Sequence, residues 1–319
     1  SDLKVIKNRR SPRKDSMSFL LIPITCFIVF SYYALCLRIH FLFPRDRFIA
    51  LFIFSFAQII LIQFLLALWG GLYLSSLIFL NLSLSLMVCF FAIQGGGHKK
   101  ILSTLKEDKT CIRVCFTPEN KFLLLLVFFA SIWIILAGIF LPPRGVDDLT
   151  YHLPPIYQAI QKHRLELLPV ELKSQFAFPF YAEFLFMWPA IFTHSQQYVD
   201  LVQLFIALTG ILTVYGLGRY MKISKDVSCL LGLLFFLSPI VLMQSGCNYI
   251  DLIVGVFFLN SLYFALMFYR YQKLSYLYVS AVSMGLMIGM KYTALMLVLF
   301  LQPFIIPKLY KRRGHFLAY

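Results

Sequence analysis

Charge is scarce in this sequence, and negative charge is scarcest. Of the 319 residues, 13% are charged, 14 are Asp or Glu, and 60% are hydrophobic. A soluble domain averages about 25% charged residues, and no globular core of this size can bury so much apolar surface. The composition therefore excludes a soluble protein and predicts a polytopic membrane protein, whose apolar runs we interpret as helices.

Two further classes of site are disfavoured. Most of the seven cysteines lie inside apolar runs, where cysteine behaves as a small hydrophobic residue. Cys111 and Cys115 form one CxxxC without a second pair or a nearby pair of histidines, which argues against a zinc site. The net charge is +15, but the basic residues form short runs between apolar spans. That pattern indicates membrane topology and argues against a partner that is a nucleic acid.

Apolar and basic runs alternate along the chain. The first apolar run, from Ser18, is too long for a signal peptide and has no small-residue cleavage site, so it predicts a retained helix. We predict a basic N-terminal tail at 1–16, three accessory transmembrane helices in 17–93, a basic cytoplasmic loop at 94–121, a transmembrane core at 122–307 and a basic cytoplasmic tail at 308–319. Because the last apolar run stops close to Tyr319, we expect a piece of a longer protein.

The basic runs predict the topology of the core. The loop 94–121 is cytoplasmic by the positive-inside rule, so the span 122–141 runs outward and 142–178 is an external loop. The apolar run 179–192 is too short to cross, since a span needs about 20 residues. The remaining spans are predicted at 198–218, 227–245, 250–269, 274–290 and 292–307. This count leaves the basic N-terminus outside, so either the first helix does not cross as drawn or the rule fails there.

The external loop begins with PPRGVDDLTYHLPP at 142–155, which places two adjacent carboxylates, Asp147 and Asp148, soon after the apolar run 122–141. The amphipathic segment after it predicts helices on the outer membrane surface, with Ile156, Ile160 and Leu165 facing lipid. The topology places Asp251 and Lys291 on the same face as Asp147. Ionisable groups at the end of a membrane span are costly unless they have a partner, so they are functional candidates.

A carboxylate close to a lysine suits one recognisable reaction. The carboxylate acts as a general base on an acceptor hydroxyl, and the lysine stabilises a phosphate leaving group. Sugar transfer from a polyprenyl-phosphate carrier needs these groups beside a lipid-facing groove. Each candidate also has a structural alternative: Asp147 and Asp251 as helix caps, Asp148 as a solvated acid, and Lys291 as a lysine that reaches the interface.

The run VDDLTYHLPPIYQAIQKHRLELLP resembles the first external loop of GT-C fold glycosyltransferases, in the group related to protein O-mannosyltransferases and aminoarabinose transferases. FPFYAEFLFMWPAIF, LSPIVLMQSGCNYIDLIVGVFFLNSLYFAL and GLMIGMKYTALMLVL follow in the order of that group. The resemblance covers about 120 to 307. It implies an all-α GT-C transmembrane bundle with an external loop of amphipathic surface helices. It also implies catalytic roles for Asp147 and Asp148, and donor-phosphate or substrate contacts for Lys291, Asp251, Tyr151 and His152. From the residues themselves we expect Lys162 and Arg164, on the surface segment, to contact the donor phosphate, and Glu183, a carboxylate that is unexpected in an apolar helix, to contact donor or acceptor.

The function implied is transfer of a sugar from a polyprenyl-phosphate donor to a lipid, glycan or protein acceptor on the external face of a multi-pass protein of the bacterial inner membrane. No cofactor is required by the pattern, and one acidic pair does not demand a divalent cation, although the pattern is compatible with one. A transporter or flippase of lipid-linked sugars is the first alternative, but it predicts charges near mid-membrane and repeated halves. A non-catalytic scaffold of envelope polysaccharide assembly is the second.

Overall fold

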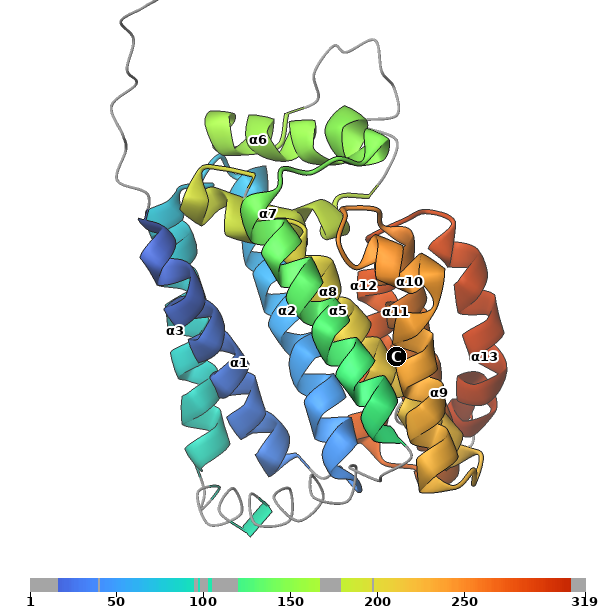
Figure 1. The fold of residues 1–319 in the computed structure, drawn as a ribbon. Helices are drawn as coiled ribbons and strands as arrows, with labels where there is room; N and C mark the ends of the chain where they lie inside the picture. The colour runs from blue at the N-terminus through green and yellow to red at the C-terminus, as the bar shows by residue number, and fades with distance from the viewer. Residues whose placement is uncertain are drawn as a thin grey trace, which may run out of the picture.

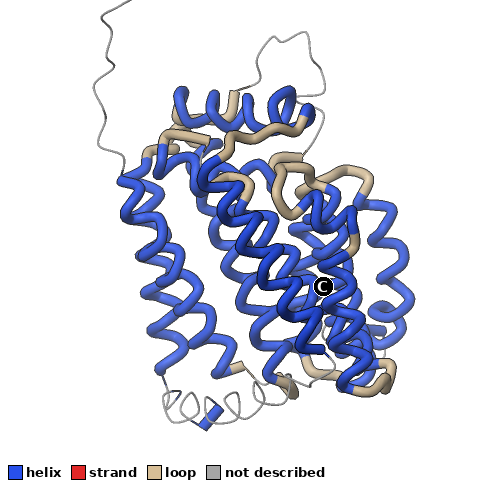
Figure 2. The backbone as a smooth tube through the Cα atoms, in the orientation of Figure 1, coloured by secondary structure: helices blue, strands red, loops and turns tan. Residues whose placement is uncertain are grey.

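The computed structural model describes residues 17–310 except residues 40, 95, 96, 98–102, 105–119, 167–178 and 197. In these residues every regular element is a helix and no strand occurs (Figure 1 and Figure 2). The predicted all-α polytopic membrane fold is confirmed. The CxxxC of Cys111 and Cys115 and the surface segment 167–178 lie outside the described residues.

Six helices of the described chain are long and apolar enough to cross a membrane. They are α1 (Leu21–Arg38) with the short helix η2 (Met17–Leu20) ahead of it, α2 (Pro44–Leu68), α3 (Leu74–Ile93), α5 (Lys121–Phe140), α8 (Leu201–Tyr220) and α11 (Asp251–Tyr271). Two shorter apolar helices follow, α12 (Leu274–Ile288) and α13 (Ala294–Tyr310). The chain is thus an integral, multi-pass membrane protein.

The predicted span 227–245 is wrong as a single helix. It forms α9 (Lys225–Leu237) and α10 (Pro239–Gln244), which are separated by Ser238 in an extended conformation, with φ −62° and ψ 137°. A proline disfavours the helical region for the residue before it, and this accounts for the break at Ser238.

One end of the bundle carries the segment that follows α5, and we call it the loop end. There the turn of π-helix η6 (Asp148–His152) leads into α6 (Leu153–Lys162), which lies across the ends of the other helices (Figure 1). The chain after α6 is tied to the turn between α2 and α3, because Leu72 N–H donates to the His163 carbonyl at 3.0 Å. Ile156 is fully buried against the bundle. The expectation that it faces lipid is wrong, since the apolar face of α6 packs on protein.

Helix α7 (Tyr181–Thr193) stays at the loop end. Its 13 residues span about 20 Å, less than the roughly 30 Å of a bilayer core. The first residue of α7 and the chain after the helix bond to loop-end residues, since Tyr181 N–H donates to the Gly289 carbonyl at 3.0 Å and Tyr198 N–H to that of Gly138 at 3.2 Å. The close approach requires glycine at 289, where a Cβ would overlap the Tyr181 ring.

Helix α2 joins the N-terminal helices to the rest of the bundle. It packs against α1 and α3 and also against α7, α8 and α12. The predicted division into accessory helices and a core stays a prediction, but α2 contacts helices of both parts. A helix in this position carries buried apolar groups on most of its sides, and 56% of its most apolar stretch is buried.

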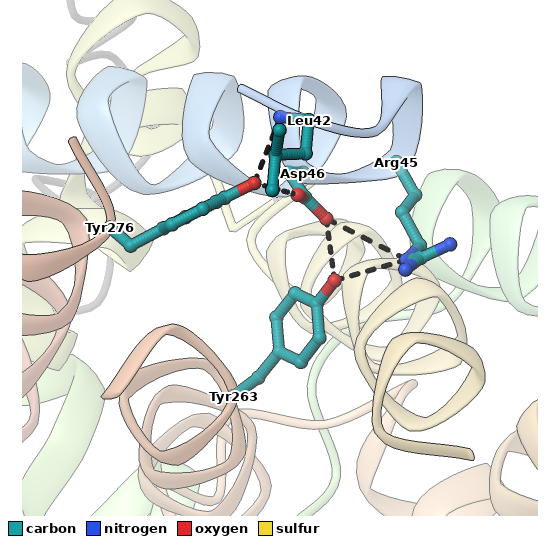
Figure 3. Close-up of polar contacts among 5 residues, drawn as sticks. All are labelled: Leu42, Arg45, Asp46, Tyr263 and Tyr276. Carbon is teal, nitrogen blue, oxygen red and sulfur yellow. Dashed lines mark hydrogen bonds and ion pairs between the residues drawn. The ribbon is translucent and has the colours of Figure 1, made fainter. Parts of the chain in front are cut away.

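The first turn of α2, at the end of the bundle opposite the loop end, holds a buried carboxylate (Figure 3). Asp46 is fully buried and accepts hydrogen bonds from the hydroxyls of Tyr263 at 2.5 Å and Tyr276 at 2.8 Å. Arg45 lies 3.6 Å from the same carboxylate and donates to the Tyr263 hydroxyl at 3.0 Å. Leu42 N–H donates to the Tyr276 hydroxyl at 2.9 Å. We call Arg45, Asp46, Tyr263 and Tyr276 the Asp46 cluster, and it fastens α2 to α11 and α12.

Candidate functional site

The acidic pair divides into one buried and one accessible carboxylate. Asp148 is fully buried, and its carboxylate accepts the backbone N–H groups of Gly145 at 3.2 Å and Asn248 at 3.0 Å. A Cβ at position 145 would overlap this carboxylate, so the close approach requires glycine. Asp148 therefore anchors η6 to the segment before α11. The alternative that it is merely solvated does not describe it.

Asp148 belongs to a polar network that could not be predicted from the sequence. The side-chain amide of Asn248 donates to the Asp200 carboxylate, just ahead of α8. Burial raises the pKa of Asp200 to about 7, against the lowering effect of that hydrogen bond, and it also raises the pKa of Asp148 above its ordinary value. The signal in the sequence was that Asp200 stands just before an apolar span, but this position alone does not identify the partner of its carboxylate.

A small cavity opens between η6, the start of α11 and the turn before α13. Its volume is about 30 Å³, which is close to the volume of one water molecule. It is lined by Asp147, Tyr151, His152, Tyr249, Ile250, Asp251 and Lys291. The structure thus brings together five of the residues proposed from the sequence: Asp147, Tyr151, His152, Asp251 and Lys291. A sugar ring is far larger than this volume, so the cavity in this conformation has no room to enclose one.

The mouth of the cavity carries an ion pair. Lys291 Nζ donates to Asp251 Oδ1 at 2.6 Å, and the two side chains are 26% and 62% exposed. Asp251 is the first residue of α11, whose N-cap is Ile250, without a side-chain capping bond. The lysine is therefore held over the mouth by a partner 40 residues earlier in the chain.

Asp147 is the acid of the pair that reaches the cavity. It occupies the N-cap position of η6, but its side chain makes no capping hydrogen bond. The hydroxyl of Tyr151 interacts with its carboxylate, and the pKa of Tyr151 lies well above its ordinary value because of burial and of this hydrogen bond. Half-buried and open to the cavity, Asp147 has the environment of a group that contacts substrate.

His152 reaches a carboxylate on another helix. Its Nδ1 lies 2.8 Å from Oε1 of Glu183, in the first turn of α7, and both residues are almost fully buried. The ring of Tyr151 lies against the imidazole, with the ring centroids 4.4 Å apart. The sequence marked Glu183 as an unexpected carboxylate in an apolar helix, but it did not predict this pairing.

Lys162 and Arg164 do not line the cavity. Lys162 Nζ bonds to Oε2 of Glu166, and Arg164 bonds to Oε1 of the same carboxylate at 2.8 Å. Both cations are exposed at the end of α6, next to the turn between α2 and α3. Their hydrogen bonds lower the pKa of Glu166, so it is ionised at neutral pH. The predicted phosphate contacts of Lys162 and Arg164 stay a prediction.

Within the described residues, no group of three or more His, Cys, Asp or Glu side chains has the arrangement to hold a metal ion. The charged groups at the cavity are instead arranged as a carboxylate beside a tyrosine, a carboxylate beside a lysine, and a histidine beside a carboxylate. Such pairs can accept and donate protons and can stabilise an anion.

Comparison with known protein families identifies a match to the second half of the chain. Residues 178–318 match the family model for dolichyl-phosphate-mannose-protein mannosyltransferases, over somewhat less than half of the chain. The match includes Glu183, Asp251 and Lys291, while Asp147 and His152 precede it. No curated protein and no solved structure matches the chain. The match confirms the resemblance over these residues and supports a membrane glycosyltransferase of the GT-C type.

Proposed function

We propose that this membrane glycosyltransferase transfers a sugar from a polyprenyl-phosphate donor to a hydroxyl of a lipid, glycan or protein acceptor. The single observation that carries the proposal is the cavity at the loop end, where Asp147, Asp251 and Lys291 come from three separate segments. The matching family, named for transfer of mannose from dolichyl phosphate to protein, supports a lipid-linked sugar as the donor. Membrane lipids surround the helices that carry the site.

The reaction is a direct displacement at the anomeric carbon of the sugar. The acceptor oxygen forms a bond to this carbon while the bond to the phosphate oxygen breaks, and the bonding pair remains on the phosphate. Asp147 accepts a hydrogen bond from the acceptor hydroxyl and either orients it or takes its proton. Lys291, held over the mouth of the cavity by Asp251, stabilises the charge on the departing phosphate.

The reaction takes place on the external face of the membrane. The basic connections after α8 and after α11 lie at the end of the bundle opposite the cavity, and such residues favour the cytoplasmic side. A lipid-linked donor on the outer face would present its phosphate beside Lys291. A divalent cation bridging a carboxylate and the phosphate is compatible with this arrangement but is not required by it.

The test is a transfer assay in membranes with radiolabelled polyprenyl-phosphate sugars, comparing wild type with Asp147→Asn at equal abundance. We expect Asp147→Asn to lower the transfer rate by about 10²- to 10⁴-fold. Asp226→Asn is a matched control, because Asp226 is an exposed carboxylate at the opposite end, in the first turn of α9. It should transfer sugar at the wild-type rate.

Two results would contradict the proposal. If Asp147→Asn transfers sugar as fast as wild type, Asp147 has no role in the reaction. If wild type transfers no sugar from any polyprenyl-phosphate donor, the alternatives are a transporter of lipid-linked sugars, for which movement of the labelled donor between leaflets is the assay, and a non-catalytic scaffold.

A further inference from the structure

The pair formed by His152 and Glu183 is the most deeply buried ionisable pair at the loop end for which a direct contact is observed. His152 is the last residue of η6, and Glu183 lies in the first turn of α7, 31 residues later in the chain. The side chains are 2% and 4% exposed, and Glu183 Oε2 has no hydrogen-bond partner among the residues that the structure describes. Because a buried carboxylate is costly without a partner, His152 is the group that makes this position of Glu183 tolerable.

The contact fixes how the imidazole is presented. Nδ1 is engaged by Glu183 Oε1, and the Tyr151 ring packs against the imidazole at an interplanar angle of 52°. Since His152 also forms part of the cavity wall, Nε2 is the ring nitrogen that remains for a group bound in the cavity. A carboxylate on Nδ1 holds the Nδ1–H tautomer, which leaves the lone pair of Nε2 as a proton acceptor.

The other ionisable groups at the cavity are engaged with one another. The Asp147 carboxylate interacts with the Tyr151 hydroxyl, and Asp251 is bonded to Lys291. Tyr249 lines the cavity with a phenol, which is a poor base at neutral pH. On its own element, His152 also has Asp148 nearby, whose carboxylate is occupied by two backbone N–H groups. Among the groups that line the cavity, His152 thus combines two properties of a general base: Nε2 is left as a proton acceptor, and the Glu183 carboxylate orients the ring.

We infer that His152 takes the proton of the acceptor hydroxyl and that Glu183 is the positioning residue that acts through it. This inference rests on the proposed function and assigns to Asp147 the orienting role. As the acceptor oxygen bonds to the anomeric carbon, its proton moves to Nε2 and the electron pair of the broken bond leaves with the phosphate. The resulting imidazolium is stabilised by Glu183 and then releases the proton to solvent, which regenerates the neutral imidazole.

The first test replaces the base. His152→Gln should lower kcat for transfer by about 10²- to 10⁴-fold, with a much smaller change in KM for the donor. His194→Gln is the matched control, because His194 is an exposed histidine just after α7, and it should keep the wild-type kcat. Imidazole added to His152→Ala should restore part of the rate, which a purely structural role of His152 would not allow.

The second test concerns Glu183, and it measures the pH dependence of the rate, which a loss of packing alone would not change. Glu183→Gln keeps the shape of the side chain and removes its negative charge, so neutral imidazole is favoured over imidazolium. The acid limb of the pH–rate profile should therefore move to lower pH, and kcat on the plateau should fall by about tenfold or more. In His152→Gln the same limb should be absent.

The outcomes separate this inference from the proposed function. If wild type transfers sugar and His152→Gln keeps the wild-type kcat, the inference is overturned while the proposed function stands. The same holds if imidazole does not rescue His152→Ala and Glu183→Gln leaves the acid limb in place. If wild type transfers no sugar from any donor tested, the proposed function fails and this inference fails with it.

Discussion

Each end of the bundle holds a carboxylate beside a cation, but the two carboxylates differ in their exposure to solvent. In the Asp46 cluster the carboxylate is fully buried, and both of its oxygens accept hydrogen bonds from tyrosine hydroxyls (Figure 3). At the cavity, Asp251 is 62% exposed and has Lys291 as its partner in the ion pair. The first carboxylate is closed off from solvent and from any ligand, whereas the second faces a cavity. The difference suggests that the Asp46 cluster serves stability and the cavity serves chemistry.

The largest effect should come from removing the carboxylate of the Asp46 cluster. Asp46→Ala leaves Arg45 without its carboxylate and removes the acceptor of Tyr263 and Tyr276. We expect the free energy of unfolding to fall by about 3–5 kcal/mol, as when one partner of a buried ion pair is lost. Reversible unfolding of the purified protein in detergent micelles measures this.

Tyr263→Phe is the graded control for that experiment, since it removes one hydroxyl and leaves the carboxylate paired. It should lower the free energy of unfolding by about 1–3 kcal/mol. Both variants should retain the wild-type kcat per folded molecule. If Asp46→Ala were as stable as wild type but lost transfer activity, the assignment of the two ends would have to be exchanged.

Removing the cavity lysine should have the converse effect. Lys291→Ala should lower kcat by about 10²- to 10³-fold, as for the loss of one group that stabilises transition-state charge. Because the pair is partly exposed, the free energy of unfolding should change by no more than about 1 kcal/mol. Lys291→Arg keeps the charge and should retain part of the rate. A large loss of stability without a loss of kcat would contradict a role of Lys291 in catalysis.

A third carboxylate, Asp200, is buried like Asp46, but its side-chain hydrogen bond comes from the neutral amide of Asn248. It extends the comparison to the pH dependence of stability. Burial raises its pKa from 3.8 to about 7 in the folded protein, so between these values the folded state binds a proton that the unfolded state does not. This contribution to stability is present at low pH and is lost as the pH rises toward 7, by about 1 kcal/mol per pH unit.

Asp200→Asn should abolish this part of the pH dependence. The variant should be more stable than wild type above pH 7, because the side-chain carbonyl of Asn still accepts the bond from Asn248 without the penalty of a buried charge. Unfolding in micelles at a series of pH values between about 4 and 8 measures the difference. Equal slopes for the two proteins would show that Asp200 does not titrate in this range.

The apolar runs were sufficient to predict the helical fold, since long stretches without charge are the strongest signal in such a sequence. The break at Ser238 was missed, although the proline at 239 was a visible signal for it. Asp46 was missed for another reason. The charged residues after Pro44 interrupt the apolar runs, and this hides the fact that Pro44 is the first residue of α2.

The residues of the candidate site were easier to predict from the sequence than the contacts between them. Topology placed Asp251 and Lys291 on one face, and their contact follows from short turns at one end of the bundle. The pairing of His152 with Glu183 was not predictable, because it depends on how α7 lies beneath α6 (Figure 1). A single sequence gives the position of each helix along the chain, but not the rotation and tilt that bring two side chains together.

The smallest effect is expected for the cations outside the cavity. It is tested with two sets of substitutions that should change KM for the donor in opposite directions. If Lys162 and Arg164 contact the donor phosphate, Glu166 competes for them, because it is ionised and bonded to both. Glu166→Gln should then lower KM for the donor by about twofold to fivefold, and the double substitution Lys162→Ala with Arg164→Ala should raise it by a similar factor, with kcat unchanged. Initial rates over a range of donor concentrations in detergent micelles give both constants. Both shifts should shrink as the salt concentration rises, because exposed charges are screened. If KM is the same in all three proteins, these cations belong to the surface of α6, and Lys291 is left as the cation that meets the phosphate.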